Sequence, residues 1–185
     1  EEIVQVDFTL YGSFANTYRG HGTDRAVVGG LLDMAVDDER LRRSLHIAKE
    51  QGLEVTFRAV HLRDAHPNTV VVEAVGESGR RVRVQAASIG GGSIRVQYLD
   101  GLEVGFSGEK ITLVIRHTDA PGAIAMVTRL LSEAGINIAT MRVFRHEVGG
   151  KACMAIELDA RPEPALLAAL RALPGLKDVT LLDQL

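Results

Sequence analysis

Polar side chains that can take part in chemistry are concentrated in residues 13–24. The segment reads SFANTYRGHGTD, and its candidate catalytic residues are Asn16, Thr17, His21, Thr23 and Asp24. Amide, hydroxyl, imidazole and carboxylate groups can bind a small polar substrate and transfer protons. Thr23 suits a helix N-cap and Asp24 a first turn, so the segment is predicted to end at a helix N-terminus, which attracts anions. The alternative is a capped helix after a glycine turn, with Arg19 and His21 in solvent.

The flanking residues predict the elements that position this segment. Residues 3–10 alternate apolar and polar side chains, as a strand does, and lead into it. After it, one helical face carries Ala26, Val27, Gly30 and Leu31. A second helix is predicted from Asp37 and Asp38 to Gly52, and strands at residues 53–60, 69–75, 81–87, 94–98 and 102–106. Residues 1–108 therefore predict an α+β domain, a mostly antiparallel sheet with two helices packed against it.

Two further motifs invite a ligand, and neither matches a known metal or phosphate pattern. Residues 61–68, HLRDAHPN, hold two histidines and an aspartate, but their spacing fits no zinc motif. We predict no metal site, and expect this turn to help shape the ligand region. Residues 90–92 are three glycines followed by a strand, whereas a phosphate-binding loop precedes a helix. They predict a tight bend, approached closely by another group such as a carboxylate.

Residues 110–185 predict a second domain with the element order βαββαβ. This order is typical of the ferredoxin-like arrangement of two helices on one face of a four-stranded sheet. Asp119 can accept from an ammonium group, Asn137 can donate and accept, and a helix opening at Pro121 can hold a carboxylate. A free amino acid needs those contacts. The alternative is that Asp119 only forms a turn, Asn137 only starts a strand and His117 is a surface side chain.

Composition excludes several classes of function. The net charge of −3 and the pI of about 6.1 argue against nucleic acid or an anionic membrane as partner. No apolar run approaches a membrane span. The lone Cys153 favours a reducing compartment, most simply the cytoplasm, and cannot hold an iron–sulfur cluster by itself.

Three runs in the N-terminal half carry a resemblance to a known family. They are GSFANT at residues 12–17, GHGTD at 20–24 and VGGLL at 28–32, with HPNT and SIGGG further on. The chain resembles the β chain of iron–sulfur-dependent L-serine dehydratases. Its first domain is similar to the allosteric substrate-binding domain shared with one type of phosphoglycerate dehydrogenase, and its second resembles an ACT domain.

The resemblance implies a lyase subunit that deaminates L-serine to pyruvate and ammonia. It implies that a [4Fe-4S] cluster lies on a separate, cysteine-bearing α chain, that this chain alone is inactive, and that the five candidate residues face substrate or that subunit. It also implies an ACT-mediated homodimer that binds L-serine or a related amino acid. The effector-binding residues would be His117, Asp119, Gly122 and Asn137. Asp119 stands where the similar serine-binding ACT domains of phosphoglycerate dehydrogenases have an Asn.

Family members carry a further substrate loop upstream, and no equivalent is seen here. Two alternatives to the lyase subunit remain open: a non-catalytic amino-acid sensor and a regulatory fragment of a phosphoglycerate dehydrogenase.

Overall fold

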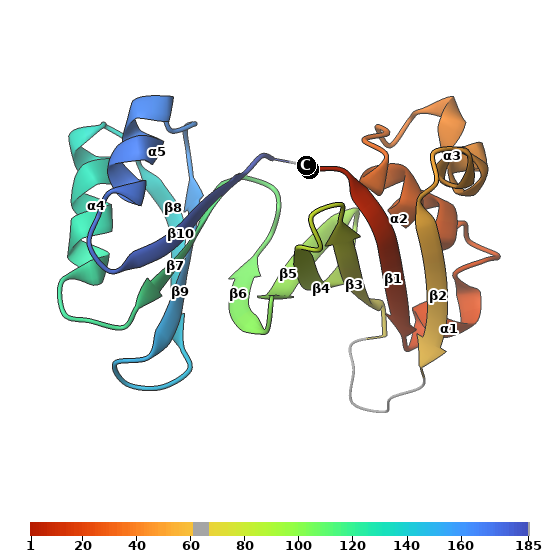
Figure 1. Cartoon of the computed structure of the whole chain (residues 1–185), viewed down its shortest axis with the longest axis horizontal. Coiled ribbons are helices and arrows are strands. Elements are labelled where there is room, and N and C mark those ends of the chain that lie inside the picture. The colour runs from red at the N-terminus through yellow and green to blue at the C-terminus, as the bar shows by residue number, and fades with distance from the viewer. Residues whose placement is uncertain (61–66, 185) are drawn as a thin grey trace. The chain divides into compact units, whose positions relative to one another are not determined.

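The structure is a computed structural model that describes residues 1–60 and 67–184. The chain divides into two compact units, Glu1–Ile89 and Gly90–Leu185, each built from strands and helices (Figure 1). The α+β class predicted from the sequence is confirmed in both. Residues 61–66, which include both histidines of the predicted loop, lie outside the described residues.

The sheet of the N-terminal unit has the strand order β2-β1-β3-β4. β1 (Ile3–Tyr11) lies between β2 (Glu54–Val60) and β3 (Thr69–Gly76), and β4 (Arg81–Gly90) follows β3. β1 is antiparallel to β3 but parallel to β2. The parallel pair is possible because the chain crosses over through helices between β1 and β2, whereas a short hairpin makes an antiparallel pair.

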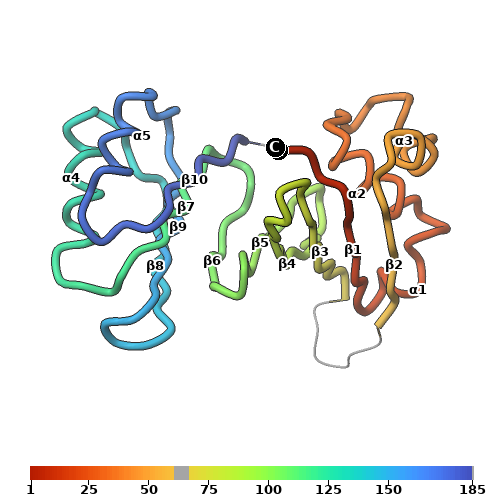
Figure 2. Tube along the Cα trace, viewed as in Figure 1, coloured from red at the N-terminus to blue at the C-terminus, as the bar shows by residue number. Residues whose placement is uncertain are grey.

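Three helices and a 3₁₀ turn form the second layer of this unit (Figure 2). They are α1 (Ser13–Thr17), α2 (Thr23–Leu31), η1 (Glu39–Arg43) and α3 (Ser44–Glu50). Their contact with the sheet buries Val6, Phe8, Val28 and Ala48 in one core. Of the two acidic residues predicted at this helix start, Asp38 is the N-cap of η1, because its carboxylate accepts from the Arg40 N–H at 2.8 Å.

The buried face of α2 differs from the predicted one. Val28 and Gly29 are buried, whereas Ala26 and Gly30 are exposed. A Cβ added at Gly29 would lie 2.1 Å from Leu41 Cδ2. The close packing of η1 against α2 therefore decides which face is buried, and side-chain hydropathy alone does not reveal it.

Three local predictions also need correction. Gly22 in the left-handed conformation, and not Thr23, is the N-cap of α2. Gly122 takes the same role in α4 (Ala123–Glu133), so that helix begins two residues after Pro121. Gly90, Gly91 and Gly92 have positive φ, as a tight bend requires, but a Cβ on any of them would meet nothing within 4 Å. On the side where a Cβ would project, the described residues therefore supply no group for the predicted close approach.

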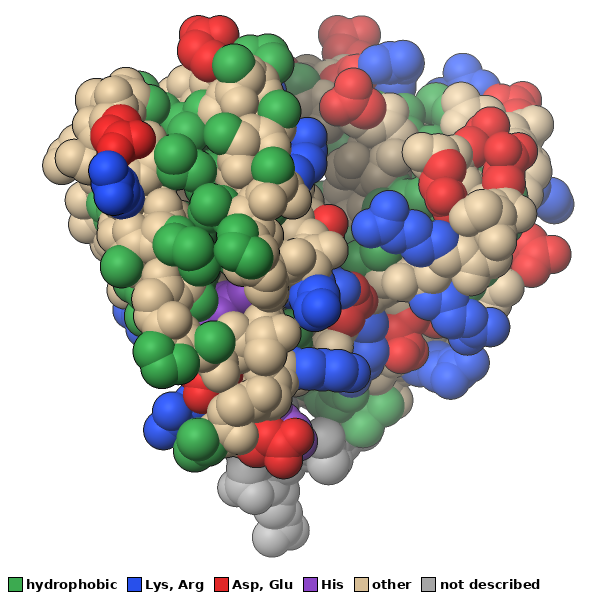
Figure 3. All heavy atoms as spheres, turned by 60° about the vertical axis from the view of Figure 1, so that its left-hand side comes forward, with side chains coloured by type: hydrophobic (Ala, Val, Ile, Leu, Met, Phe, Trp, Pro, Cys, Tyr) green, Lys and Arg blue, Asp and Glu red, His purple; other side chains and the backbone are tan. Residues whose placement is uncertain are grey.

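The C-terminal unit contains the predicted βαββαβ order. Its antiparallel sheet runs β10-β7-β9-β8, with β7 (Ile111–Thr118), β8 (Ile138–Arg145), β9 (Lys151–Leu158) and β10 (Leu176–Leu182). α4 and α5 (Pro164–Arg171) pack on one face, around Leu113, Ile115 and Leu170. Figure 3 shows that hydrophobic side chains also reach the surface, and in this unit Ile124 and Val148 are exposed.

A hairpin of β5 (Ser93–Leu99) and β6 (Leu102–Phe106) belongs to the same unit. β6 lies against β8 and β9. Cys153 and Ala155 lie on the face of β9 away from the helices, yet both are almost completely buried. The two units divide between residues 89 and 90, ahead of residue 109, where the sequence places the limit. The domain limits of 1–108 and 110–185 stay a prediction.

Candidate functional site

Two motifs that are far apart in the sequence meet at the start of α1. The backbone N–H groups of Ser13 and Phe14 both donate to the Pro67 carbonyl, at 2.5 and 3.2 Å. Gly12 has φ 59° and ψ −124°, and a Cβ there would lie 2.5 Å from the Pro67 Cα. Only glycine fits this contact. The GSFANT segment is therefore positioned by the chain that follows residues 61–66.

α1 is a short helix in which two side chains donate hydrogen bonds to backbone carbonyls of the preceding turn. The Thr17 hydroxyl donates to the Ser13 carbonyl at 2.9 Å, and the Asn16 amide reaches the Gly12 carbonyl at 3.5 Å. The His21 N–H donates to the Thr17 carbonyl at 2.9 Å, which continues the turn, and the His21 side chain is exposed. Asn16 and Thr17 thus support the local backbone, while His21 is accessible to a ligand or a partner.

An aromatic stack fixes the loop between α1 and α2 on the sheet. The rings of Phe8 and Phe57 stack at 5.0 Å between centroids, and Tyr18 stacks on Phe57 at 5.7 Å. The guanidinium of Arg19 lies over the Tyr18 ring at 5.4 Å. Such contacts restrict a long, otherwise mobile cation. Arg19 is therefore held at the surface within the predicted segment.

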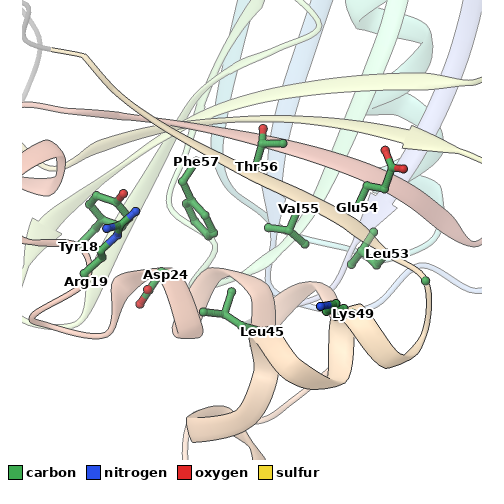
Figure 4. A pocket seen from close by; sticks show the side chains of 11 residues that line it. Tyr18, Arg19, Asp24, Leu45, Lys49, Leu53, Glu54, Val55, Thr56 and Phe57 are labelled. Atoms are coloured by element: carbon green, nitrogen blue, oxygen red, sulfur yellow. The ribbon is translucent and has the colours of Figure 1, made fainter.

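A groove of about 690 Å³ opens between this loop, α3 and β2. Figure 4 shows Leu53, Val55 and Phe57 pointing from β2 and the residue before it toward the helices, and Glu54 and Thr56 pointing the other way. The lining residues are Tyr18, Arg19, Asp24, Leu45, Lys49, Gly52, Leu53, Glu54, Val55, Thr56 and Phe57. The groove combines an apolar floor with two cations and two carboxylates.

Only one of the five predicted catalytic residues lines the groove. Asp24 lines it and is 8 % exposed, with its carboxylate accepting from the Arg25 N–H at 2.9 Å. Asn16, Thr17, His21 and Thr23 lie in the same segment but do not line it. Sequence reasoning missed Lys49 and Glu54. The alternation of charged and apolar residues from Glu54 onward is the available signal, and by itself it predicts only a strand.

The predicted effector residues begin at the end of β7. The Asp119 carboxylate accepts from the Gly149 N–H at 3.1 Å and from Arg145 at 3.3 Å. The Gly149 hydrogen bond, with Arg145, keeps the pKa of Asp119 below its ordinary value despite some desolvation. Gly122 caps α4 nearby in sequence, with open space where a Cβ would be. A charged acceptor therefore lies just before the start of α4.

His117 is buried next to this acceptor and has one ring nitrogen without a partner. It is 4 % exposed, and its Nδ1 lies 2.9 Å from the Thr118 carbonyl oxygen. Its Nε2 has no hydrogen-bond partner among the described residues. An unsatisfied buried polar atom is costly, so this nitrogen is available to a ligand that reaches it.

Asn137 lies at the other end of the same sheet. Its amide donates to Asp159 at 2.7 Å, and Asp159 also accepts from Lys110 at 2.8 Å. Ala152 is the register partner of both His117 and Arg145, whereas Leu158 is the partner of Ile138. Ala152 and Leu158 are six residues apart along β9, so His117 and Asn137 lie about 20 Å apart along the sheet. One chain therefore does not bring the predicted effector residues together.

The described residues do not fit an iron–sulfur cluster or another metal centre. Cys153 is 1 % exposed, and burial raises the pKa of its thiol to about 11. A cluster ligand must be an accessible thiolate, and about three or four are needed. No group of three or more His, Cys, Asp or Glu side chains in the described part of the chain is arranged to hold a metal ion.

Comparison with known proteins identifies the family. The pattern of the serine dehydratase beta chain family matches residues 1–53, and that of the ACT domain matches residues 111–175. A probable L-serine dehydratase beta chain of Bacillus subtilis is 39% identical over 172 residues, which cover 93% of this chain and 78% of that protein. The chain belongs to the serine dehydratase beta chain family.

A second member of the serine dehydratase beta chain family, from Peptoniphilus asaccharolyticus, is 35% identical over 90% of this chain and 75% of its own length. A D-3-phosphoglycerate dehydrogenase of Methanocaldococcus jannaschii is 29% identical over 86% of this chain, but the match covers only 30% of that protein. The regulatory-fragment alternative is therefore less well supported than the lyase subunit. Among the described residues no helix is long and apolar enough to cross a membrane.

Proposed function

We propose that this chain is the β subunit of an L-serine ammonia-lyase, in which it completes the serine site of a cysteine-bearing α chain. The observation that carries the proposal is the meeting of two family motifs, where Gly12 and the Pro67 carbonyl hold the start of the GSFANT segment. That contact gives the polar loop a defined shape on the surface. Two of the most similar relatives compared are named as L-serine dehydratase beta chains.

The reaction removes the α-proton and the hydroxyl of serine, and the enamine that forms is hydrolysed to pyruvate and ammonia. The [4Fe-4S] cluster expected on the α chain would supply the Lewis acid for the departing hydroxyl. On this chain, the accessible His21 imidazole holds or moves a proton, or binds the substrate carboxylate. The first turn of α2, which bears Thr23 and Asp24, directs its N–H groups toward an anion.

The test is serine turnover by the reconstituted enzyme under anaerobic conditions. Replacement His21→Ala should lower kcat/KM by about 100-fold if the imidazole transfers a proton. His46→Ala is the matched control, because His46 is also exposed and lies away from the polar loop, where it pairs with Glu50 of α3 at 3.2 Å. Undiminished turnover by H21A would remove His21 from the mechanism. The chain without its α partner should show no turnover, which also tests the cluster's place on that partner.

We also propose that the ACT domain binds L-serine or a related amino acid between two copies of the chain. His117 and Asp119 lie at one end of the sheet and Asn137 at the other. An ACT-mediated homodimer would bring the Asn137 of one copy to the Asp119 of the other. Calorimetric titration with L-serine should show binding that Asp119→Ala and Asn137→Ala each abolish. Heat release that both variants retain would place the effector elsewhere.

The second candidate function is a non-catalytic amino-acid sensor. It is favoured by the match to D-3-phosphoglycerate dehydrogenase, because a region shared by enzymes with different chemistry is suited to regulation. A sensor would bind serine at the ACT domain but would not support turnover with any α chain. A cytoplasmic location is part of both proposals, since a single cysteine suits a reducing compartment.

A further inference from the structure

β2 leaves one side of the N-terminal unit's sheet open. It pairs with β1 along a regular register from Glu54 to Val60, and no other described strand pairs with its outer edge. The groove follows this edge, because five consecutive residues, 53–57, line it. An unpaired edge presents backbone N–H and C=O groups that can bind another strand. β2 has no bulge and no proline to prevent such pairing.

The side chains of β2 limit the ways in which a second copy can pair with it. Glu54, Thr56 and Arg58 are the exposed residues of this alternation. Figure 4 shows Val55 and Phe57 pointing toward the helices, and Glu54 and Thr56 pointing away from them. In a symmetric antiparallel pair, residues that face each other must lie on the same side of the sheet. The two-fold axis must therefore lie between one residue and the same residue of the second copy. Moving the axis by one residue changes the partner of every other residue by two positions.

Only one of these registers is complementary in charge. When Thr56 faces its own copy, Glu54 faces the second copy's Arg58, and Val55 faces the second copy's Phe57. With the axis one residue earlier, Glu54 would face Thr56, and with the axis one residue later it would face Val60. Opposite charges and large apolar pairs stabilise neighbouring strands. The sequence EVTFR at residues 54–58 is thus self-complementary in the antiparallel direction.

The two charged groups are free to make these contacts. The Arg58 side chain is 69 % exposed and lies 3.8 Å from Asp7, a loose ion pair at most. Glu54 is exposed at the start of β2. On the helix side of the groove, Leu45 is 36 % exposed and would be covered by an incoming strand.

We propose that the outer edge of β2 is an interface between two copies of this chain, paired antiparallel about Thr56 into one continuous sheet. One strand pair buries much less surface than a standard interface, so the association should be weak by itself. It does not depend on the proposed role of His21, but an incoming strand would cover part of the groove that Asp24 lines. It is also separate from any ACT-mediated contact, because β2 and the ACT domain belong to different units.

Cysteine cross-linking of the full-length chain tests the register directly. Thr56→Cys should form a covalent dimer with a mild oxidant or a short bismaleimide, because facing residues of antiparallel strands lie about 4.5–5.5 Å apart. Glu54→Cys and Arg58→Cys should not cross-link alone, since each would be about 13 Å from its own copy. A mixture of these two variants should cross-link. The buried Cys153 gives little background, as wild-type chain will show.

Charge reversal then tests the complementarity. On the T56C background, Glu54→Arg should weaken dimerisation about tenfold, because it places like charges opposite each other twice. The exchange Glu54→Arg with Arg58→Glu should restore it, and Glu77→Arg, at an exposed turn of the same unit, should not affect it. If no variant cross-links, the proposal is wrong, and the charges of β2 either prevent edge pairing or contact a different protein. Cross-linking by E54C alone would disprove the register.

Discussion

At the scale of single residues, Gly12 controls the shape of the polar loop. Its φ of 59° and ψ of −124° belong to a region that side chains with a Cβ rarely adopt, and the Pro67 backbone occupies the place of a Cβ. The backbone conformation of Gly12 and its contact with Pro67 thus each require a glycine at this position. Gly20, in the same loop, has neither restriction, because a Cβ there would make an ordinary contact of 3.7 Å with the Thr17 carbonyl oxygen.

Replacement Gly12→Ala should therefore lower the free energy of unfolding by about 2 kcal/mol or more, through backbone strain and a forced shift of Pro67. Gly20→Ala is the control and should change it by less than about 1 kcal/mol. Urea denaturation followed by circular dichroism measures both. A G12A chain as stable as wild type would show that the contact between the two motifs is dispensable.

Glu157 is the buried carboxylate whose environment makes stability depend on pH. It is 6 % exposed and accepts from the Ser107 N–H at 2.9 Å, the Ser107 hydroxyl at 2.6 Å and the Thr140 hydroxyl. Burial by itself raises the pKa of Glu157, but these hydrogen bonds together outweigh burial, and the net pKa lies below the ordinary value. The ionised form is therefore favoured by folding.

Because the folded pKa is the lower one, this stabilisation is complete above the unfolded glutamate pKa of about 4.3 and is lost as the pH falls through the folded value. Glu157→Gln should destabilise the chain near pH 7, and its difference from wild type should shrink below about pH 4. Glu163→Gln, an exposed change before α5, should show no such trend. Denaturant titrations across this pH range measure the difference, and a constant gap would contradict the assignment.

At the scale of elements, the crossover between β1 and β2 depends on how α3 attaches to α2. Ser44 is completely buried at the start of α3, and its hydroxyl donates to the Arg25 carbonyl of α2 at 2.8 Å. Gly29 allows η1 to approach α2 closely. These contacts hold α3 over β2 and so form one wall of the groove.

Removal of this hydroxyl should weaken the attachment of α3. Ser44→Ala leaves the Arg25 carbonyl without its donor and should cost about 1–3 kcal/mol. Ser132→Ala, at an exposed position of α4, should stay within about 0.5 kcal/mol of wild type. Thermal or urea unfolding measures both variants. If S44A were as stable as S132A, water would have replaced the lost donor.

At the scale of the whole molecule, the C-terminal unit includes more than its βαββαβ sheet. The β5–β6 hairpin contacts β8 and β9. Arg116 forms an ion pair with Asp100 in the turn of this hairpin, and Ser107 bonds to Glu157. The hairpin thereby covers the face of the sheet that the two helices leave open.

A fragment of residues 90–185 should therefore unfold cooperatively and at a higher temperature than a fragment of residues 110–185. The shorter fragment exposes the apolar side chains on the open face and leaves Glu157 without Ser107. Differential scanning calorimetry of the two fragments measures this difference. Equal melting temperatures would favour the predicted limit at residue 109 over the division at residue 89.

The sequence by itself determined the class of each unit, the βαββαβ order, an acidic helix start at Asp37 and Asp38, and the family to which the chain belongs. These depend on local patterns of hydropathy, turn residues and short motifs, which the chain carries wherever it folds. Only the tertiary structure decided the parallel pairing of β1 with β2, the contact of Pro67 with Gly12, and the groove with Arg19, Asp24 and Lys49. Each of these joins residues distant in the sequence, and such packing leaves no local signal.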